Sequence, residues 1–598
     1  MDELSSAKPQ ELRLPIGIDD YKKVIDESCF YVDKTLLIKE FLEKGSGVLL
    51  VTRPRRFGKT IALSMLRYFF EKPVSAKTDQ STAYLFEKSN IWKEEKYRNI
   101  QGTFPVIFIS FKSVKHNTWE ESYAQFKSIL KNEVDRTLTP LVKKLLPAEK
   151  KEYKQLMDLI PFSDEAQSLV SYIGSLKFIS KVYFRIYKKN TIMLIDEYDT
   201  PVTYSYIHGF HKELIKFMSA LLSEALKGND YMHKSFLTGV VRTAKDGILS
   251  GLNNPTVYTM TYSQFGDKFG FTESETDYLL EKAGYLDKRE ELKSWYNGYV
   301  IGEEKSSQVK VYNPWSVLCY VENFCAPKPY WARTGSVELL ERLIKEADEP
   351  IQKELKLLME GHVLENKRIN ENVILLDLDR KTVEPWSFLF FAGYVTAINH
   401  TFRDDLDYYT LAIPNKEIAK LYNDLVLGAL NQTVTSDKLL KLMEALISGR
   451  VLELESLLKE FILSLCSFYD LPHNDIERSL HMFVLGLLAS LSERYVIKSN
   501  LESGIGRYDV SMHPKRIGDL AVVIEFKKGQ DTKKLEKLSS EELEKELNKL
   551  SDEALKQIKI AQYESNLRDF GYKGKVLCYG IACFRKHLVA KMEISYVN

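Results

Sequence analysis

The sequence predicts an α/β protein with an N-terminal parallel sheet, a helix-rich middle region and a second, smaller α/β domain at the C-terminus. Between residues 15 and 265, short apolar runs typical of buried strands alternate with helical patterns, which favours a parallel sheet covered by helices. After a helix-rich stretch, the last part reads as a helix, three strands, a charged helix and a final strand.

Composition sets broad limits. The 598 residues are too many for one hydrophobic core, and 44% of them are apolar, so we expect several packed domains. The 84 basic and 83 acidic residues nearly cancel, so overall charge neither favours nor excludes a nucleic-acid partner. The six cysteines show no zinc spacing. The N-terminus has no secretory signal and no run of about eighteen apolar residues occurs, so we expect no membrane span and a soluble, intracellular protein, cytoplasmic if bacterial.

The predicted elements divide the chain into three domains, 1–268, 269–425 and 426–598. The first has four predicted strands, at 47–52, 104–111, 190–195 and 235–241, and a helix at 60–70. The middle region contains the aromatic clusters WYNGY, YNPWS and YW, which we interpret as helix–helix packing. The last domain has predicted helices at 475–492 and 533–566 and strands at 495–499, 506–512, 520–527 and 576–584.

The stretch RPRRFGKT at 53–60 lies between a predicted strand and a predicted helix. Free N–H groups and the dipole at a helix N-terminus attract phosphate. We expect Gly58 to let the backbone approach the phosphate of a nucleoside triphosphate closely, Lys59 to reach the β- and γ-phosphates, and the Thr60 hydroxyl to ligate Mg²⁺. The usual pattern G-x-x-x-x-G-K-[ST] has glycine where this chain has Arg53. The remaining predicted nucleotide-binding residues are Arg53, Arg56 and Phe57.

Two carboxylates, Asp196 and Glu197, follow the apolar run NTIMLI. Ligands bind at the carboxyl ends of strands in open parallel sheets. We therefore expect Asp196 to hold Mg²⁺ and Glu197 to activate the attacking water, although an acidic helix cap is the alternative for such a pair. Thr238, near the end of the fourth strand, is a candidate γ-phosphate sensor. Arg242 is either a residue that stabilises transition-state charge or a surface arginine, and the sequence leaves both open.

A second set of candidate residues lies near the C-terminus. Glu525 and Lys527 share one face of a predicted strand, and a short connection would pair this strand with the one that carries Asp509. Two carboxylates that hold Mg²⁺ and a lysine beside them suit a metal-dependent phosphodiesterase. Glu477, on the preceding helix, is a candidate further ligand. An exposed β-hairpin with a lysine is the alternative, since such triples are common by chance.

The ordered motifs YVDKT, RPRRFGKT, LIDEYD, WYNGY, YNPWS, FAGYVT and IPN resemble those of AAA-ATPase-like proteins that carry a C-terminal nuclease domain of the PD-(D/E)XK superfamily. The resemblance covers nearly the whole chain. It implies a P-loop NTPase parallel sheet, a helical middle region and a C-terminal α/β PD-(D/E)XK-like domain. It also implies that Arg53 is the family's variant of the phosphate loop, and that GRYD at 506–509 and EFK at 525–527 form the nuclease motif.

Three functional hypotheses follow. The first is an ATPase coupled to a Mg²⁺-dependent nuclease that acts on DNA or RNA. The second is a nucleotide-switched module that binds nucleic acid or protein without cleavage. The third is an interaction scaffold that docks partners on the aromatic middle region. The intact set of Asp509, Glu525 and Lys527 favours the first hypothesis. A homo-oligomer is possible, because an arginine that acts in trans would require one.

Overall fold

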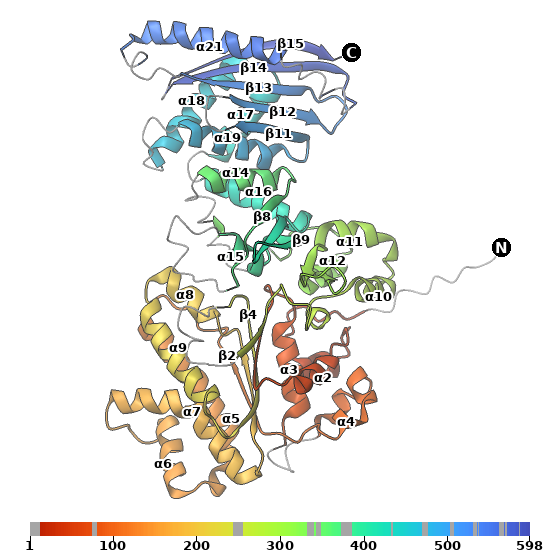
Figure 1. Ribbon diagram of the computed structural model, residues 1–598, viewed down its shortest axis with the longest axis vertical. Helices are drawn as coiled ribbons and strands as arrows, with labels where there is room; N and C mark the ends of the chain where they lie inside the picture. Colours follow the sequence, from red (N-terminus) through yellow and green to blue (C-terminus); the bar gives the residue numbers. More distant parts are fainter. Residues whose placement is uncertain are drawn as a thin grey trace, which may run out of the picture. The chain divides into compact units, whose positions relative to one another are not determined.

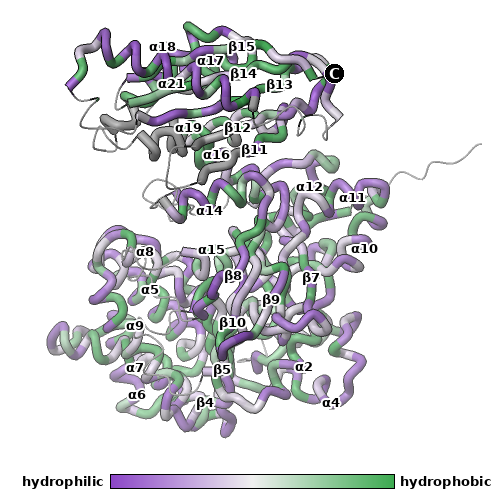
Figure 2. The backbone as a smooth tube through the Cα atoms, turned by 45° about the horizontal axis from the view of Figure 1, so that its top comes forward, coloured by the Kyte–Doolittle hydropathy of each residue, from purple (hydrophilic) through white to green (hydrophobic). Residues whose placement is uncertain are grey.

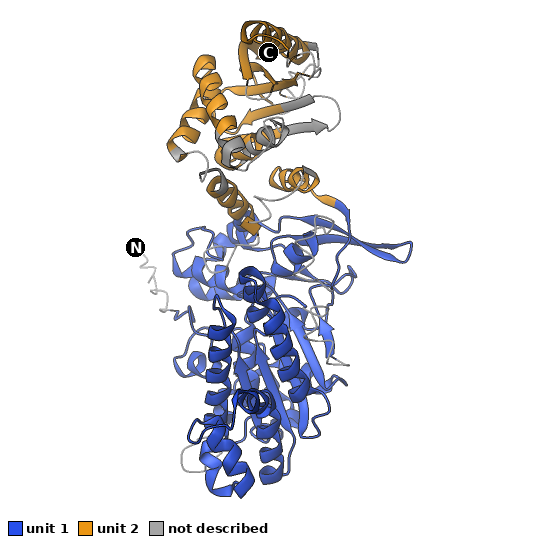
Figure 3. Cartoon of the chain, turned by 90° about the vertical axis from the view of Figure 1, so that its left-hand side faces the viewer, with its two compact units in different colours: residues 1–335, 365–417 blue, residues 336–364, 418–598 orange. Residues whose placement is uncertain are grey.

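The computed structural model describes residues 12–73, 81–242, 255–331, 340–341, 349–371, 385–431, 435–468, 476–502, 507–529, 535, 537–560, 567, 571–584 and 587–597. Contacts divide the chain into two compact units (Figure 3). The first unit comprises residues 1–335 and 365–417, and the second comprises residues 336–364 and 418–598. Each unit has its own five-stranded sheet.

The main sheet of the first unit has five parallel strands in the order β2-β3-β4-β1-β5. Its strands are β1 (Val48–Thr52), β2 (Val106–Ser110), β3 (Thr191–Asp196), β4 (Met232–Gly239) and β5 (Pro255–Tyr258). Strand β4 lies between β1 and β3. The end of β4 therefore lies between the loop that follows β1 and the acidic residues that end β3.

Strands β1 and β3 are buried along their full length, as their apolar sequences VLLVT and TIMLID require. Helices cover both faces of the sheet: α3 (Lys59–Phe70) lies on one side, and α5 (Trp119–Leu138), α7 (Glu165–Tyr187) and α9 (His211–Leu226) lie on the other (Figure 1). The remaining helices of this half are α1 (Tyr21–Asp26), α2 (Leu36–Glu43), η1 (Thr82–Leu85), η2 (Asn90–Lys93), α4 (Glu95–Arg98), η3 (Thr139–Lys144), α6 (Pro147–Leu156) and α8 (Thr200–His208).

The rest of the first unit combines short helices with two small sheets. Its helices are η4 (Gly266–Lys268), α10 (Glu273–Ala283), η5 (Leu286–Lys288), α11 (Arg289–Tyr296), α12 (Pro314–Glu322) and α15 (Trp386–Ala392). Strands β6 (Tyr299–Ile301) and β7 (Val309–Val311) form one sheet, and β8 (Leu364–Lys367), β10 (Leu406–Ala412) and β9 (Thr396–Arg403) form the other. Tyr296 of WYNGY and Tyr312 of YNPWS share a buried core cluster, and Trp295 and Tyr330 pack against it, which confirms the predicted packing role for these aromatic residues.

The second unit contains a mixed sheet in the order β11-β12-β13-β14-β15. Its strands are β11 (Tyr495–Glu502), β12 (Arg507–Pro514), β13 (Ala521–Lys528), β14 (Gly574–Phe584) and β15 (His587–Val597). Only the β13–β14 pair is parallel among the strand pairs in the described part of this sheet. The helices are α14 (Glu349–Met359), α16 (Lys416–Asn431), α17 (Ser436–Ile447), α18 (Val451–Phe468), α19 (Ile476–Leu491) and α21 (Ser540–Ile560).

Helices cover both faces of this mixed sheet. Phe483 of α19 packs edge-on against Phe526 of β13, and Leu555 of α21 packs in a cluster with Val523 of β13. Because side chains alternate along a strand, residues 523 and 526 point to opposite faces. Helix α21 alternates between hydrophilic and hydrophobic residues, as expected for a helix with one face on a sheet (Figure 2).

The predicted strands of both sheets are confirmed, with boundaries that differ by a few residues. Strands β5 and β15 were not predicted. The division into three domains stays a prediction, and contacts group the residues differently: much of the expected middle region joins the first unit. The reason is that this region packs around the loop after β1. Among the helices in the described ranges, none is long and apolar enough to cross a membrane.

Candidate functional site

The loop that follows β1 runs from Arg53 to Gly58 and leads directly into α3. Gly58 precedes the first helical residue with φ of +83°, a left-handed conformation that glycine adopts without strain. Arg56 has φ of +65°, which is uncommon for a residue with a side chain. Such strain persists where the surrounding structure fixes it, and often at functional sites. The loop therefore presents the N-terminus of α3 in a fixed shape.

Lys59 is the first residue of α3 and is almost completely buried. Its ammonium group donates to the carbonyl oxygens of Arg53 and Pro54, at 2.9 and 2.8 Å. Burial lowers the pKa of Lys59, while the nearby carboxylates of Glu197, Asp199 and Asp196 act in the opposite direction. The lysine is thus held inside the loop, beside the acidic end of β3.

Asp196 ends β3 and is fully buried. It accepts hydrogen bonds from three hydroxyl groups: Thr60 at 2.8 Å, Thr238 at 2.7 Å and Ser110 at 3.3 Å. Burial, and then the neighbouring Glu197, raise the pKa of Asp196. The Thr60 hydroxyl and the Asp196 carboxylate are hard oxygen donors in contact, and Mg²⁺ prefers such donors, so this pair fits a magnesium ion.

Glu197 lies next to this cluster with φ of +50°, and its carboxylate accepts a hydrogen bond from the Thr200 hydroxyl at 3.1 Å. The following acid, Asp199, is buried and accepts the N–H groups of Val240 and Val241, each at 2.8 Å. Asp199 therefore ties the end of β3 to the segment after β4. Glu197 is the carboxylate of this group that remains partly exposed.

Lys115 is a cation of this site that the sequence did not single out. It lies in the segment after β2, and its electrostatic neighbours include Glu197, Arg55 and Arg56. Burial lowers the pKa of Lys115, and the Glu197 carboxylate opposes that shift. The register of β2 on β3, which sets Ser110 opposite Asp196, brings this segment to the site. The position of Lys115 near Glu197 could be predicted only from knowing that β2 and β3 are neighbours in the sheet.

Arg53 differs from the expectation that its side chain contacts the nucleotide. Its guanidinium is fully buried and donates to four backbone carbonyls, those of Thr52, Tyr258, Thr259 and Gln264, at 2.8 to 3.2 Å. Burial lowers its pKa to about 9. Arg53 thus ties residues 53–58, which we call the phosphate loop after its predicted role, to β5 and the segment after it, and its side chain is not directed to the α3 N-terminus.

Arg242 follows the two residues that bind Asp199. One of its guanidinium nitrogens lies 3.7 Å from a carboxylate oxygen of Glu371. Glu371 also accepts a hydrogen bond from Thr259 at 3.1 Å and one from Thr261. This arrangement leaves open both roles considered for Arg242.

Four consecutive residues of the phosphate loop contact the aromatic part of the first unit, which sequence reasoning did not anticipate. The Arg55 carbonyl accepts hydrogen bonds from the Trp331 indole at 3.0 Å and the Asn313 amide at 3.3 Å. The Arg56 guanidinium lies 4.4 Å from the centre of the Trp315 ring. The motifs YNPWS and YW therefore serve the loop as well as the core.

The other two contacts involve Pro54 and Phe57. The Phe57 ring packs edge-on against Tyr299, with ring centres 5.1 Å apart. Gly393 lies so close to Pro54 that an added Cβ would come within 2.9 Å of its ring. We call Tyr299, Asn313, Trp315, Trp331 and Gly393 the loop clamp. The signal in the sequence for these contacts was that WYNGY, YNPWS and FAGYVT all follow the phosphate loop in the chain.

Glu417 is hydrogen-bonded to Trp331 of the loop clamp and to the neighbouring Ser316. Its carboxylate is fully buried and accepts the Trp331 backbone N–H at 2.6 Å and the Ser316 hydroxyl at 2.8 Å. Burial raises the pKa of Glu417 to about 7, against the opposing effect of these donors and the Tyr330 N–H. An ionisable group thus lies two hydrogen bonds away from the phosphate loop.

We expect the Glu417→Gln variant to gain stability over the wild type as pH rises. The pKa of Glu417 is about 7 in the folded chain and near 4.5 when unfolded, so the folded state holds the proton between these values and must bury a charge above them. The gain is small near pH 5 and reaches up to about 3 kcal/mol near pH 8. Denaturant unfolding across this range measures it. The same substitution at exposed Glu290 is the control, and parallel pH profiles for the Glu417→Gln variant and the wild type would contradict the assignment.

The second unit places the C-terminal motif on two adjacent strands. Asp509 of β12 lies directly opposite Glu525 of β13 in antiparallel register, as predicted. Lys527 lies two residues beyond Glu525 on the same strand, and therefore on the same face. Glu525 is fully buried and Lys527 is partly exposed. A buried carboxylate opposite a second acidic position provides a donor set that fits a divalent cation.

Helix α21 passes closely over this face. Glu525 lies beside Gly580 of β14, where an added Cβ would come within 2.3 Å of the Ser551 carbonyl. Glu477 is in α19, which covers the opposite face, so the structure does not group it with Glu525 on one face of the sheet. The side chains of Glu477 and Asp509, with Gly506, lie outside the described residues.

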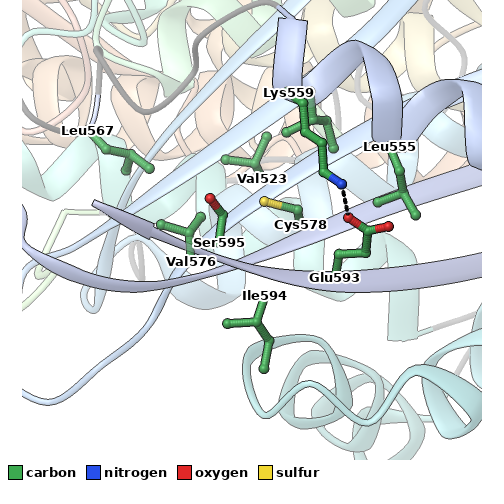
Figure 4. A pocket seen from close by; sticks show the side chains of 10 residues that line it. Val523, Leu555, Lys559, Leu567, Val576, Cys578, Glu593, Ile594 and Ser595 are labelled. Atoms are coloured by element: carbon green, nitrogen blue, oxygen red, sulfur yellow. Dashed lines mark ion pairs between the residues drawn. The ribbon is translucent and has the colours of Figure 1, made fainter. Parts of the chain in front are cut away.

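A cavity of about 110 Å³ lies under α21 on this face (Figure 4). Val523, Leu555, Val576 and Cys578 form apolar walls, and Lys559 and Glu593 form an ion pair of 2.5 Å. Its lining is mainly apolar and includes none of Asp509, Glu525 and Lys527. We therefore separate it from the carboxylate pair.

Known proteins match both regions. Residues 15–249 match the family model of a predicted AAA-ATPase, and residues 475–593 match that of the PD-(D/E)XK nuclease superfamily. An uncharacterized protein in the vnfD 5' region of Azotobacter chroococcum mcd 1 is 24% identical over 421 residues, which cover 69% of this chain and 70% of that protein. No solved structure matches the chain. The first match contains the phosphate loop and Asp196, and the second contains the segment from Asp509 to Lys527.

Proposed function

We propose that this chain hydrolyses ATP and thereby controls a metal-dependent nuclease that acts on DNA or RNA. The match of one region to an AAA-ATPase-like family model and of another to the PD-(D/E)XK nuclease superfamily supports this proposal. One observation carries the ATPase part. The phosphate loop, the acidic end of β3 and the end of β4 meet in one hydrogen-bonded group, in which Thr60 and Thr238 both bind Asp196. This is an arrangement that can hold a nucleotide and its metal.

The chain's own residues divide the work of hydrolysis. The loop N–H groups and Lys59 bind and orient the phosphates. Thr60 and Asp196 would hold Mg²⁺, which neutralises charge on the β- and γ-phosphates when bound. Glu197 orients the attacking water and accepts its proton. Lys115 adds positive charge on the side of the site that faces β2.

For the nuclease part, Asp509 and Glu525 would hold the metal ion, which supplies an activated water when bound. Lys527 is placed to stabilise the charge on the phosphate or to position the nucleophile. The family match and the antiparallel register of Asp509 on Glu525 support this assignment.

A second candidate function is a nucleotide-switched module that binds nucleic acid or protein without cleavage. The complete burial of Glu525 beside the α21 crossing favours it, because a metal and a phosphodiester must both reach this carboxylate for cleavage. The first experiment is therefore a cleavage assay on single- and double-stranded DNA and RNA, with Mg²⁺ or Mn²⁺, with and without ATP. Metal-dependent cleavage supports the nuclease, and intact ATP hydrolysis without any cleavage supports the binding module.

We expect the Glu197→Gln variant to bind ATP with nearly wild-type affinity and to hydrolyse it at least about 100-fold more slowly, because general-base catalysis contributes about 10²- to 10⁴-fold. The amide keeps the shape of the side chain but does not accept the proton. Fluorescent-ATP titration and phosphate release measure the two quantities. Glu213→Gln, on the exposed face of α9, is the matched control. Normal turnover in Glu197→Gln would mean that another residue activates the water.

A further inference from the structure

The loop clamp does more than pack around the phosphate loop, because it is joined to the start of another helix. Trp331 contacts the Arg55 carbonyl through its indole N–H and contacts Glu417 through its backbone N–H. Asn313 also binds the Arg55 carbonyl, and it caps α12, the helix that contains Ser316. Ser316 in turn binds Glu417. Two hydrogen-bonded routes therefore run from one loop carbonyl to one carboxylate.

Glu417 is the second residue of α16 (Lys416–Asn431). The boundary between the two compact units follows Glu417, so the chain passes from the first unit to the second within this helix. The chain also crosses between the units after residue 335 and within β8. The crossing in α16 begins with Glu417, which is hydrogen-bonded to Trp331 and Ser316.

We propose that Glu417 couples the phosphate loop to α16, so that nucleotide binding at the loop stabilises the hydrogen bonds of α16. This inference rests on the proposed nucleotide function and adds the route by which the nucleotide state reaches the second unit. Glu417 acts as a positioning residue, because it touches Trp331 and Ser316 and not the nucleotide.

The direction of the effect follows from the loop contacts. Lys59 donates two of its three N–H groups to the Arg53 and Pro54 carbonyls, so a phosphate that takes the third would fix the lysine and, with it, the backbone next to Arg55. The Arg55 carbonyl passes this restraint to Trp331 and Asn313. Both residues lead to the Glu417 carboxylate, whose anchoring fixes the first turn of α16. Ordering the loop therefore orders the start of the helix, and the coupling is reciprocal.

Hydrogen exchange of the full chain, with and without Mg²⁺ and a non-hydrolysable ATP analogue, tests the proposal. The readouts are a peptide from the phosphate loop and a peptide from α16. In the wild type we expect the analogue to slow exchange in both peptides by at least about fivefold, the lower end of typical coupling between sites. In Glu417→Ala we expect protection of the loop peptide alone.

Two further variants separate coupling from a general loss of structure. Glu417→Gln retains an acceptor for the Trp331 N–H and a donor for the Ser316 hydroxyl, so we expect it to restore protection of α16. Trp331→Phe removes the indole hydrogen bond to Arg55 but leaves the backbone contact with Glu417, so it cuts one of the two routes. We expect it to reduce the protection of α16, a result that can be read even if Glu417→Ala does not fold. Trp295→Phe, a core substitution in α11, is the matched control.

The outcomes are distinct. Protection of α16 that persists in both Glu417→Ala and Trp331→Phe overturns the coupling role. A wild type with protection of the loop but not of α16 also overturns it, and leaves the nucleotide site standing. A wild type without protection of the loop refutes the proposed nucleotide function, and the coupling with it.

Discussion

Replacing Lys59 with alanine is expected to weaken ATP binding by about 30-fold to several thousandfold, since removing one partner of a buried charge pair typically costs about 2–5 kcal/mol. Lys59 is the cation at the start of α3, beside Asp196 and Glu197. Its loss removes the positive charge that faces the β- and γ-phosphates. Titration with a fluorescent ATP analogue measures the change.

The control for this substitution is Lys234→Ala. Lys234 is also a buried lysine with a pKa lowered by burial, and its ammonium group donates to the carbonyls of Phe41, Leu42 and Lys44. It lies near the amino end of β4, away from the phosphate loop. We expect Lys234→Ala to lower stability and keep ATP affinity. Equal affinities for Lys59→Ala and the wild type would remove the nucleotide-binding assignment.

The second large effect concerns cleavage. We expect Glu525→Gln, like Asp509→Ala and Lys527→Ala, to lower the cleavage rate by roughly a thousandfold or more, because the charge stabilisation that a bound metal supplies is worth several kcal/mol. The amide fits the same buried space, so ATP hydrolysis should remain largely intact. A nuclease assay with Mg²⁺ and a phosphate-release assay on the same preparations measure both activities.

Lys528→Ala is the neighbouring control, since residue 528 follows Lys527 on β13 and points to the other face. Full cleavage by Glu525→Gln or by Lys527→Ala would refute the nuclease assignment. Parallel loss of cleavage and ATP hydrolysis in Glu525→Gln would instead indicate a folding defect in the whole chain.

The sequence predicted the parts of the sites that depend on local pattern. A strand, a glycine and a helix start place Lys59 and Thr60, and an apolar run that ends in two carboxylates places Asp196. The alternation of side chains, with a short connection, placed Asp509 opposite Glu525. Each of these inferences needs a few neighbouring residues and one rule of secondary structure.

The remainder depends on contacts between residues far apart in the chain. Trp331 and Arg55 are 276 residues apart in the chain, and no local pattern distinguishes this tryptophan from a core residue. The role of Arg53 was missed because the carbonyls that surround it come from β5 and the segment after it, and β5 itself was not predicted. Lys115 depends on the adjacency of β2 and β3.

The contacts of Lys59 have a further consequence for which anions the protein selects. The lysine donates two of its three N–H groups to the carbonyls of Arg53 and Pro54, so one N–H remains for an incoming anion. A lone orthophosphate would gain that contact and the few loop N–H groups within its reach. In the proposed complex, a triphosphate with its metal would contact the loop N–H groups, Lys59 and Thr60 together, so we expect the site to favour the nucleotide over free phosphate.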